Sequence, residues 1–220
     1  MHQPTSMRAL LAELLGTYAL VFAGTGAIVV NAHTGALGHT GVAATFGLVV
    51  MAMIYAFGSV SGAHLNPAVT LGFAAARRFP GRQVPPYLGA QLAGALLASL
   101  TLRLLFPESA SLGATVPAGT GLQSFILEAI LTFLLMLVIL QVAHGAKEVG
   151  IMAGIAIGAV VALEALFAGP ISGASMNPAR SIAPAVVSGQ LQHLWIYIAA
   201  PIIGALLATA TWTLLRPNAA

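Results

Sequence analysis

The chain has 220 residues, of which 59% are hydrophobic and only 6% are charged. A soluble domain carries about 25% charged residues, so this composition excludes an ordinary soluble protein and indicates an integral membrane protein. The net charge of +3 comes from scattered basic residues, which argues against nucleic-acid binding, and the lack of cysteine excludes disulfides, thiolate metal sites and cysteine nucleophiles.

Six apolar segments are long enough to cross a bilayer, which takes roughly 20 residues per helix. We expect membrane-spanning helices at 8–31, 40–60, 84–106, 122–143, 149–168 and 192–215. The first segment follows Met7 and Arg8 in the manner of a signal peptide. It is longer than a signal peptide and contains Glu13, so we expect it to be retained as a span.

Two further apolar stretches, at 67–76 and 178–188, are too short to span the membrane. Each one follows an asparagine and opens with a proline, in the tripeptides Asn66-Pro67-Ala68 and Asn177-Pro178-Ala179. Asparagine is favoured at a helix cap and proline at the first helical position. These stretches therefore read as half-helices that stop midway, which the membrane tolerates where protein buries them or where they line a watery cavity.

The distribution of basic residues predicts the orientation of the chain. With six spans, six of the eight basic residues fall on one side, namely Arg8, Arg77, Arg78, Arg82, Lys147 and Arg216. We assign that side to the cytoplasm of a multi-pass protein of the cell membrane. Both termini are then cytoplasmic, the first half-helix enters from the cytoplasm, and the second enters from outside.

The chain is a single channel-like domain built from two similar halves, residues 1–110 and 111–220. The matched features are Glu13 with Glu128, Thr17 with Thr132, and the string Ser-Gly-Ala-x-x-Asn-Pro-Ala at 61–68 and at 172–179. Three spans per half is an odd number, so the halves must lie in opposite orientations. Inverted repeats of this kind place their site near the membrane midplane, where the halves meet.

Two half-helices that enter from opposite faces meet by their N-termini, and each N-terminus carries about half a positive charge. The resulting positive focus repels cations, and Asn66 and Asn177 each add an amide that can donate to a passing oxygen. The alternative is that each Asn-Pro pair only caps a surface helix. The duplication in matched repeats favours the pore.

These strings resemble the aquaporin or major intrinsic protein family over essentially the whole chain. GAHLNPAVT at 62–70 and MNPARS at 176–181 are the most specific, while 169–176 and 16–24 resemble the nodulin-26-like branch. The resemblance implies an all-α membrane protein with six transmembrane helices and two half-membrane helices. It also implies a homotetramer in the lipid bilayer, with no cofactor and no metal.

Arg180 directly follows the second Asn-Pro-Ala, and an intramembrane arginine is a functional hypothesis by default. The resemblance implies that it forms one wall of an outer constriction, with Phe46, Ala165 and Ala174 as the other walls. Water-selective members commonly have histidine at the position of Ala165. We therefore expect a pore for water and small uncharged solutes such as glycerol, urea, ammonia or neutral metalloid hydroxides, with a strictly water-selective pore as the alternative.

Other polar residues leave alternatives open. Glu13 and Glu128 are expected to support the half-helix loops, and the rival reading is a proton-coupled transporter that uses them as relays. Glu164 would either bond the backbone of the 169–176 loop or tune the charge of the filter. His64 would line the cytoplasmic vestibule, either as a pH sensor or as a hydrogen-bonded loop histidine.

The rest of the chain offers little chemistry. The loop at 107–121, rich in glycine, serine and proline, could cover the outer mouth. The sequence contains no aspartate, no cysteine and no Gly-x-Ser-x-Gly elbow, so we expect no enzyme activity.

Overall fold

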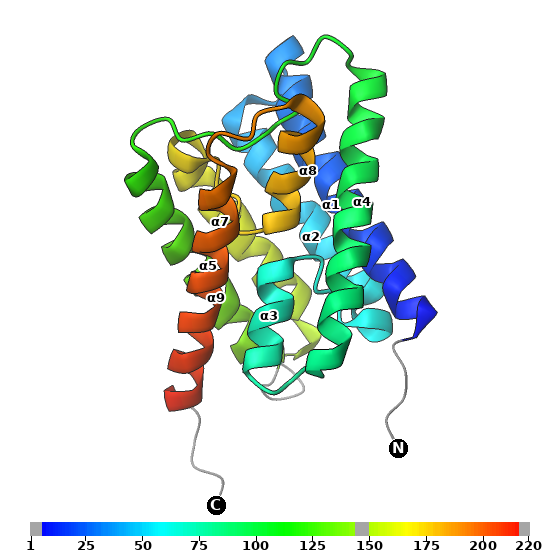
Figure 1. The fold of residues 1–220 in the computed structure, drawn as a ribbon, viewed down its shortest axis with the longest axis vertical. Coiled ribbons are helices and arrows are strands. Elements are labelled where there is room, and N and C mark those ends of the chain that lie inside the picture. Colours follow the sequence, from blue (N-terminus) through cyan, green and yellow to red (C-terminus); the bar gives the residue numbers. More distant parts are fainter. Residues whose placement is uncertain (1–5, 144–149, 216–220) are drawn as a thin grey trace, which may run out of the picture.

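The computed structural model describes residues 6–143 and 150–215. Within this part of the chain all regular structure is helical (Figure 1). The six long helices are α1 (Met7–Thr34), α2 (Gly38–Ser61), α4 (Val84–Leu105), α5 (Gly121–Ala143), α7 (Ala153–Ser172) and α9 (Leu194–Leu215). The short ones are α3 (Pro67–Ala75), the single 3-10 turn η1 (Gly81–Gln83) and α8 (Pro178–Ser188).

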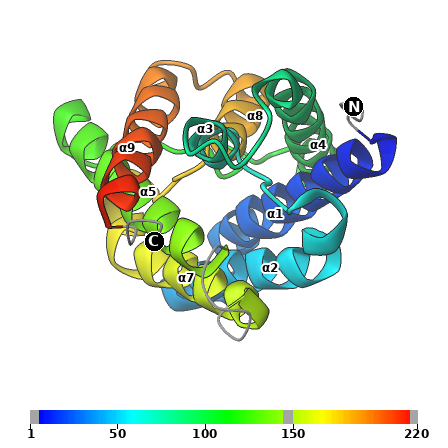
Figure 2. The ribbon, with the colours of Figure 1, turned by 90° about the horizontal axis from the view of Figure 1, so that it is seen from below.

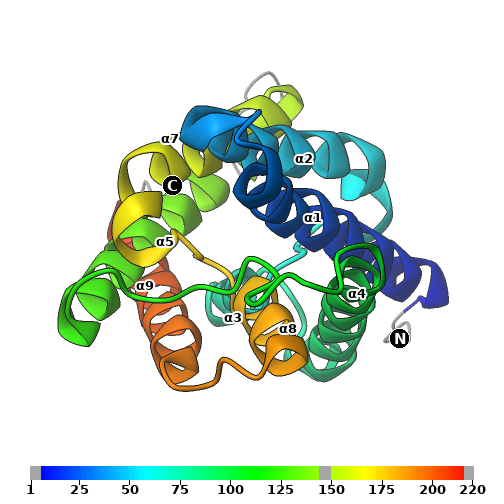
Figure 3. The same ribbon diagram turned by 90° about the horizontal axis from the view of Figure 1, so that it is seen from above.

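The long helices are each apolar enough and long enough to cross a membrane. The two short helices lie between α4 and α9, with the other long helices to one side, and they overlap when the bundle is viewed along its axis from either end (Figures 2 and 3). Figure 1 shows α8 in one half of the bundle and α3 in the other, so the two are stacked along the axis. This arrangement confirms the expected fold class of six spans and two half-helices.

The long helices pack as matched pairs, α1 with α4, α5 with α9, and α2 with α7. Small residues allow the first two pairs to approach closely. A Cβ atom on Gly94 of α4 would overlap the carbonyl oxygen of Leu14 on α1. A Cβ atom on Gly204 of α9 would overlap the carbonyl oxygen of Ala129 on α5 in the same way. These close contacts fix α4 and α9, the long helices against which α3 and α8 pack.

One helix differs from expectation. The fifth span was expected at 149–168, and α7 runs instead over Ala153–Ser172, with Pro170 inside its last turn. Proline has no N–H, so the carbonyl of Leu166 loses its usual helical partner. The Nε2 atom of His39 lies 2.7 Å from that oxygen and replaces the missing bond. The helix therefore passes the proline and ends before Gly173, which has a φ of 89°.

Four of the six described basic residues share one end of the bundle, whereas Arg103 near the end of α4 and Arg180 in α8 lie elsewhere. Helix α1 begins and α9 ends at the end that also holds the turn between α3 and α4 (Figure 1). Arg8 lies at the start of α1, and Arg77, Arg78 and Arg82 lie in and beside that turn. Lys147 and Arg216 lie outside the described residues.

Candidate functional site

The two asparagines cap the two half-helices. Asn66 has extended backbone, and its Oδ1 accepts from the backbone N–H of Ala68 at 2.9 Å. Asn177 does the same, accepting from Ala179 at 3.0 Å and from Arg180 at 3.3 Å. An N-cap oxygen satisfies N–H groups that the first helical turn leaves without partners. Both side-chain oxygens therefore face their own helices, and both amide nitrogens face away.

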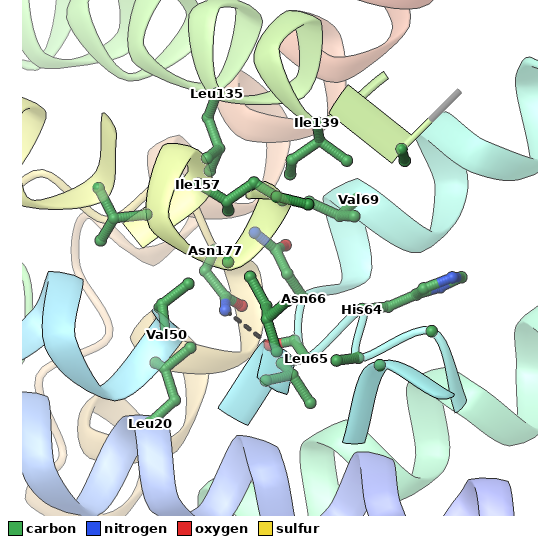
Figure 4. A pocket seen from close by; sticks show the side chains of 18 of the residues that line it. Leu20, Val50, His64, Leu65, Asn66, Val69, Leu135, Ile139, Ile157 and Asn177 are labelled. Atoms are coloured by element: carbon green, nitrogen blue, oxygen red, sulfur yellow. Dashed lines mark hydrogen bonds between the residues drawn. The ribbon is translucent and has the colours of Figure 1, made fainter. Parts of the chain in front are cut away.

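The amide nitrogens join the two halves of the chain. Nδ2 of Asn66 donates to the carbonyl of Met176 at 2.8 Å, and Nδ2 of Asn177 donates to the carbonyl of Leu65 at 2.9 Å (Figure 4). Each amide carries two N–H groups, so one remains after the cross-bond is made. Both asparagines line a cavity of about 640 Å³, which we call the inner cavity. The structure thus places two amide donors side by side at the meeting point of the half-helices.

Glu13 supports the loop that leads to α3. Its carboxylate is fully buried. Its donors are the backbone N–H of His64 at 2.9 Å and of Leu65 at 2.8 Å, the hydroxyl of Ser61 at 2.7 Å and Nε2 of Gln91 at 2.8 Å. Four donors on one carboxylate hold the loop against α1.

Glu128 supports the loop that leads to α8 in the matching way. It accepts from the backbone N–H of Ser175 and of Met176, each at 2.9 Å. The hydroxyl of Ser172 adds a third bond at 2.7 Å. Neither Glu128 nor Glu13 lines either of the cavities described here, so both carboxylates serve the loops from behind.

The glutamates also decide which way the loop carbonyls point. In a trans peptide the N–H and the preceding carbonyl point in opposite directions. The carbonyls of Ala63 and His64 therefore face away from Glu13, and those of Ala174 and Ser175 face away from Glu128. These residues line the inner cavity, so the carbonyls add acceptors to its wall. The required turn uses left-handed backbone at Ala63, Leu65, Ala174 and Met176.

Two cavities meet at one pair of residues. The outer cavity, of about 530 Å³, lies beside the ends of α1, α2 and α7. Among the described residues, Phe46 and Arg180 are the two that line both cavities. The path between the cavities therefore passes between an aromatic ring and a guanidinium group.

Two contacts hold Arg180 in place. It is 1% exposed, and its Nη1 donates to the carbonyl of Gly113 at 2.9 Å. Its Cζ lies 5.0 Å from the centroid of the Phe46 ring, within the range of a cation–π contact. Its Nε is buried and has no hydrogen-bond partner among the described residues. The guanidinium is thus held by a loop carbonyl and a ring at the boundary between the two cavities.

The remaining two predicted filter residues lie on either side of this pair. Ala165 lines the outer cavity and Ala174 lines the inner cavity. Each ends in a methyl group, so neither side chain reaches across the path. The structure therefore places Ala174 and Ala165 in the cavities on either side of the junction, and the bulky side chains at the junction itself are those of Phe46 and Arg180.

Comparison with known proteins adds independent information. The X-ray structure of the aquaglyceroporin from Plasmodium falciparum matches with a TM-score of 0.86 and 26% identity, over 94% of this chain and 96% of that chain. Aquaporin NIP1-1 of Oryza sativa subsp. japonica is 50% identical over 212 residues, which cover 96% of this chain and 75% of the relative. Nodulin-26 of Glycine max is 48% identical over 212 residues, covering 96% of this chain and 78% of that relative. A sequence model described as major intrinsic protein matches residues 1–212.

The chain belongs to the major intrinsic protein family. It is an integral membrane channel for water and small neutral solutes, and not an enzyme. The resemblance inferred from the Asn-Pro-Ala strings is confirmed, including its nodulin-26-like character.

In this channel His64 sits at the edge of the inner cavity inside an aromatic cluster. Its ring centroid lies 4.7 Å from that of Phe73, 4.8 Å from Phe79 and 5.2 Å from Tyr87. Its Nδ1 lies 3.2 Å from the hydroxyl oxygen of Thr70. The half-buried ring therefore has both packing and a hydrogen bond, as the reading of a bonded loop histidine anticipates.

Two tyrosines of the aquaporin fold were missed by the sequence reasoning. The hydroxyl of Tyr87 donates to the carbonyl of Ser61 at 2.9 Å, and that of Tyr197 donates to the carbonyl of Ser172 at 2.7 Å. Each bond fixes the last residue of the helix before a half-helix loop. The tyrosines recur at the same spacing as Gly94 and Gly204, so the repeat contained the signal that identifies them.

Two other expectations had mixed outcomes. Glu164 is 1% exposed, and neither carboxylate oxygen has a hydrogen-bond partner among the described residues, so the expected bond to the 169–176 loop is not formed. Its electrostatic neighbour is Glu128, on α5. The loop at 107–121 does reach the outer mouth, because Ala114 and Val116 line the outer cavity.

Proposed function

We propose that this channel passes water together with small uncharged solutes such as glycerol and urea. The supporting observation is the junction of the two cavities, where Phe46 and Arg180 form two walls and the alanines at 165 and 174 leave the other two sides open. Ammonia and neutral metalloid hydroxides are uncharged as well and fit the same opening. The name of the aquaglyceroporin neighbour supports glycerol as the first solute to test.

The chemistry of the path suits a solute with one polar and one apolar side. The guanidinium of Arg180 lines the path as a donor group, the loop carbonyls offer acceptors, and Phe46 offers an apolar wall. A polyol passes by exchanging its water hydrogen bonds for these, while its carbon backbone lies against the ring. Loss of water without replacement would cost several kcal/mol per polar group, so matched partners along the path lower the barrier.

The exclusion of ions and protons follows from the half-helix ends and the arginine, which is the general account of aquaporin-type pores. The N-termini of α3 and α8 direct their positive ends at the paired asparagines. A water molecule there turns its oxygen toward the remaining N–H groups of Asn66 and Asn177 and cannot accept a proton from its neighbour. We therefore propose Asn66, Pro67, Ala68, Asn177, Pro178 and Ala179 as the central barrier.

The rival reading of a proton-coupled transporter has less support. Glu13 and Glu128 each accept bonds from backbone N–H and hydroxyl donors, which favour the ionised form of a carboxylate. A relay must release and rebind protons along a path. We propose instead that both glutamates hold the loops in the orientation that aims carbonyls at the pore.

We also propose the arrangement of the channel in the membrane. The described basic residues at the α3 end support a cytoplasmic location for that end, with both termini on the same side. The two inverted halves, 1–110 and 111–220, then form one domain, and the family relationship supports a homotetramer. Chemical cross-linking in native membranes tests the assembly, and accessibility of cysteines introduced at the exposed Arg82 and Glu108 tests the orientation.

Stopped-flow light scattering on liposomes tests the proposed solutes. Wild-type protein should give fast water efflux in sucrose and re-swelling in glycerol or urea. Ala165→His, which adds bulk and a donor between the cavities, should abolish the re-swelling and keep water flux. Ala165→Ser serves as the matched control, because it adds a hydroxyl with little bulk. Water flux without solute flux in the wild type would refute the wide filter, and solute flux that requires a proton gradient would favour the transporter.

A further inference from the structure

Phe46 has an unusual neighbour at one edge of its ring. Gly24, on α1, is buried directly against its ring. A Cβ atom built on Gly24 would lie within 2.6 Å of three carbon atoms of that ring. Non-bonded carbon atoms rest at about 3.5–4.0 Å. The ring could therefore not keep its position beside any residue larger than glycine.

The Phe46 ring also contacts Arg180. The guanidinium carbon of Arg180 lies 5.0 Å from the ring centroid, and Arg180 is itself held by the carbonyl of Gly113. Phe46 is 8% exposed, and the open space beside it consists of the two cavities that it lines. A ring pushed off α1 therefore moves into the solute path or displaces the arginine.

The pairing of a glycine with an aromatic ring occurs in the first half of the chain and is not repeated at the matching positions of the second half. The register that matches Glu13 with Glu128 matches Gly24 with Ile139, and the register of the Asn-Pro-Ala strings matches Phe46 with Ile157. Ile139 and Ile157 both line the inner cavity (Figure 4). One half thus pairs glycine with an aromatic ring, and the other pairs two branched aliphatic side chains.

We propose that Gly24 is a positioning residue that sets where the Phe46 ring stands in the filter, and so which solutes pass. The inference rests on the proposed function for its solute, but the contact between Gly24 and Phe46 does not. Gly24 acts from behind the ring and lines neither cavity. Because Gly24 has no side chain, the Phe46 ring can keep its position at the edge of the path. The small side chains at 165 and 174 would not by themselves keep the filter wide if the ring moved into the path.

The test compares wild type, Gly24→Ala, Phe46→Ala and the double variant in liposomes. Gly24→Ala should lower glycerol permeability about tenfold, which corresponds to about 1.4 kcal/mol of added barrier. Water permeability should fall less, because water needs a narrower opening. In the Phe46→Ala background the same alanine should change glycerol permeability by less than about twofold, the scatter expected of independent sites.

The matched control is Gly89→Ala on α4, because a Cβ atom there meets no heavy atom within 4 Å. It should leave both permeabilities unchanged. Gel filtration in detergent and far-UV circular dichroism check that each variant is folded. If Gly24→Ala alone fails to fold, the double variant must recover a folded protein, because the overlapping ring is gone. A double variant that stays unfolded would overturn the proposal.

Two further outcomes would also overturn it. One is an unchanged glycerol permeability in Gly24→Ala, and the other is an equal loss in both backgrounds. Failure of the proposed function gives a different result. If the wild type passes water and no glycerol, the same four proteins are compared by water flux, which Gly24→Ala must lower only where Phe46 is present.

Discussion

The two loop-supporting glutamates make the same kind of contact, and the structure predicts that both sites tolerate loss of charge poorly. The perturbation is the replacement of each carboxylate by the amide of the same shape, in Glu128→Gln and Glu13→Gln. An amide keeps one acceptor oxygen and replaces the other by a donor. The cost depends on what the neighbouring groups can do in response.

At Glu128 the neighbours cannot adapt. If the new nitrogen takes the place of Oε2, the N–H of Met176 faces another donor, and the amide N–H groups have no acceptor. If it takes the place of Oε1, the N–H of Ser175 and the hydroxyl of Ser172 both lose their acceptor. Either orientation leaves two buried donors unsatisfied. At about 1–3 kcal/mol per group, Glu128→Gln should cost about 2–6 kcal/mol.

At Glu13 one neighbour can rotate, but the rotation has its own cost. Nε2 of Gln91 donates to Oε2, and Oε1 of Gln91 has no partner among the described residues. Rotation of the Gln91 amide presents this oxygen to the new amide nitrogen, but it takes Nε2 away from the hydroxyl of Thr70, to which it donates at 2.9 Å, and into a buried position without a described acceptor. The N–H of Leu65 and the Gln91 amide then stay unsatisfied, so Glu13→Gln should also cost about 2–6 kcal/mol.

Thermal unfolding in detergent, followed by tryptophan fluorescence, measures both losses. At about 2–4 °C per kcal/mol for a chain of this size, each variant should lower the Tm by several degrees. In the Gln91→Leu background the Tm loss caused by Glu13→Gln should be smaller, because no Gln91 amide is left unsatisfied there. A Tm loss of less than about 2 °C in either single variant would refute this reasoning.

Three other variants give separate predictions. Arg180→Ala should admit cations, because a unit charge at 4 Å opposes a cation by about 4 kcal/mol at an effective dielectric constant of 20. The measurement is the leak of sodium ions or protons into dye-loaded liposomes. An unchanged leak would show that the arginine is not part of the barrier. Gly113→Ala should lower solute selectivity, because it displaces the carbonyl that holds Arg180. The φ of 73° at this position disfavours a side chain, and the new Cβ would lie 2.8 Å from Thr25. An unaltered ratio of glycerol to water permeability would contradict this prediction. Tyr197→Phe removes the bond to the carbonyl of Ser172 and should lower stability by about 1 kcal/mol with little change in permeability. A large loss of flux in Tyr197→Phe at unchanged Tm would be inconsistent with a purely structural bond.

The spans and half-helices could be predicted because the membrane restricts what a chain can do. A run of about 20 apolar residues has one stable form in lipid, a helix, and most expected ends lie within three residues of those observed. The exceptions are the two ends of α7, which were expected at 149 and 168 and are observed at Ala153 and Ser172. At its later end the helix continues past Pro170. That proline is tolerated because His39, 127 residues away from Leu166, supplies the missing hydrogen bond. A distant partner of this kind leaves no local signal.

The site was predictable to a similar degree. The repeated Asn-Pro-Ala strings indicated two capped half-helices that meet, whereas Phe46, Ala165 and Ala174 were assigned through the family resemblance and not through any local pattern. Of the two roles expected for Glu164, the bond to the 169–176 loop is not formed, although an acidic residue near a loop is usually bonded to it, and the effect on the charge of the filter stays a prediction. Here the carboxyl points to no donor among the described residues, and helical phase alone does not reveal the direction of a long side chain.

The reciprocal bonds of the two asparagines have a consequence for how the channel is made. Asn66 donates to a carbonyl 110 residues further along the chain, so its partner does not exist when the first half leaves the ribosome. At about 5–20 residues per second, roughly ten seconds pass before the second loop is synthesised. Until then the amide of Asn66 and the carbonyl of Leu65 have only water or lipid headgroups to bond. The first half therefore stays incomplete until the second loop is made, and both cross-bonds at the centre of the pore form in a single late step of assembly.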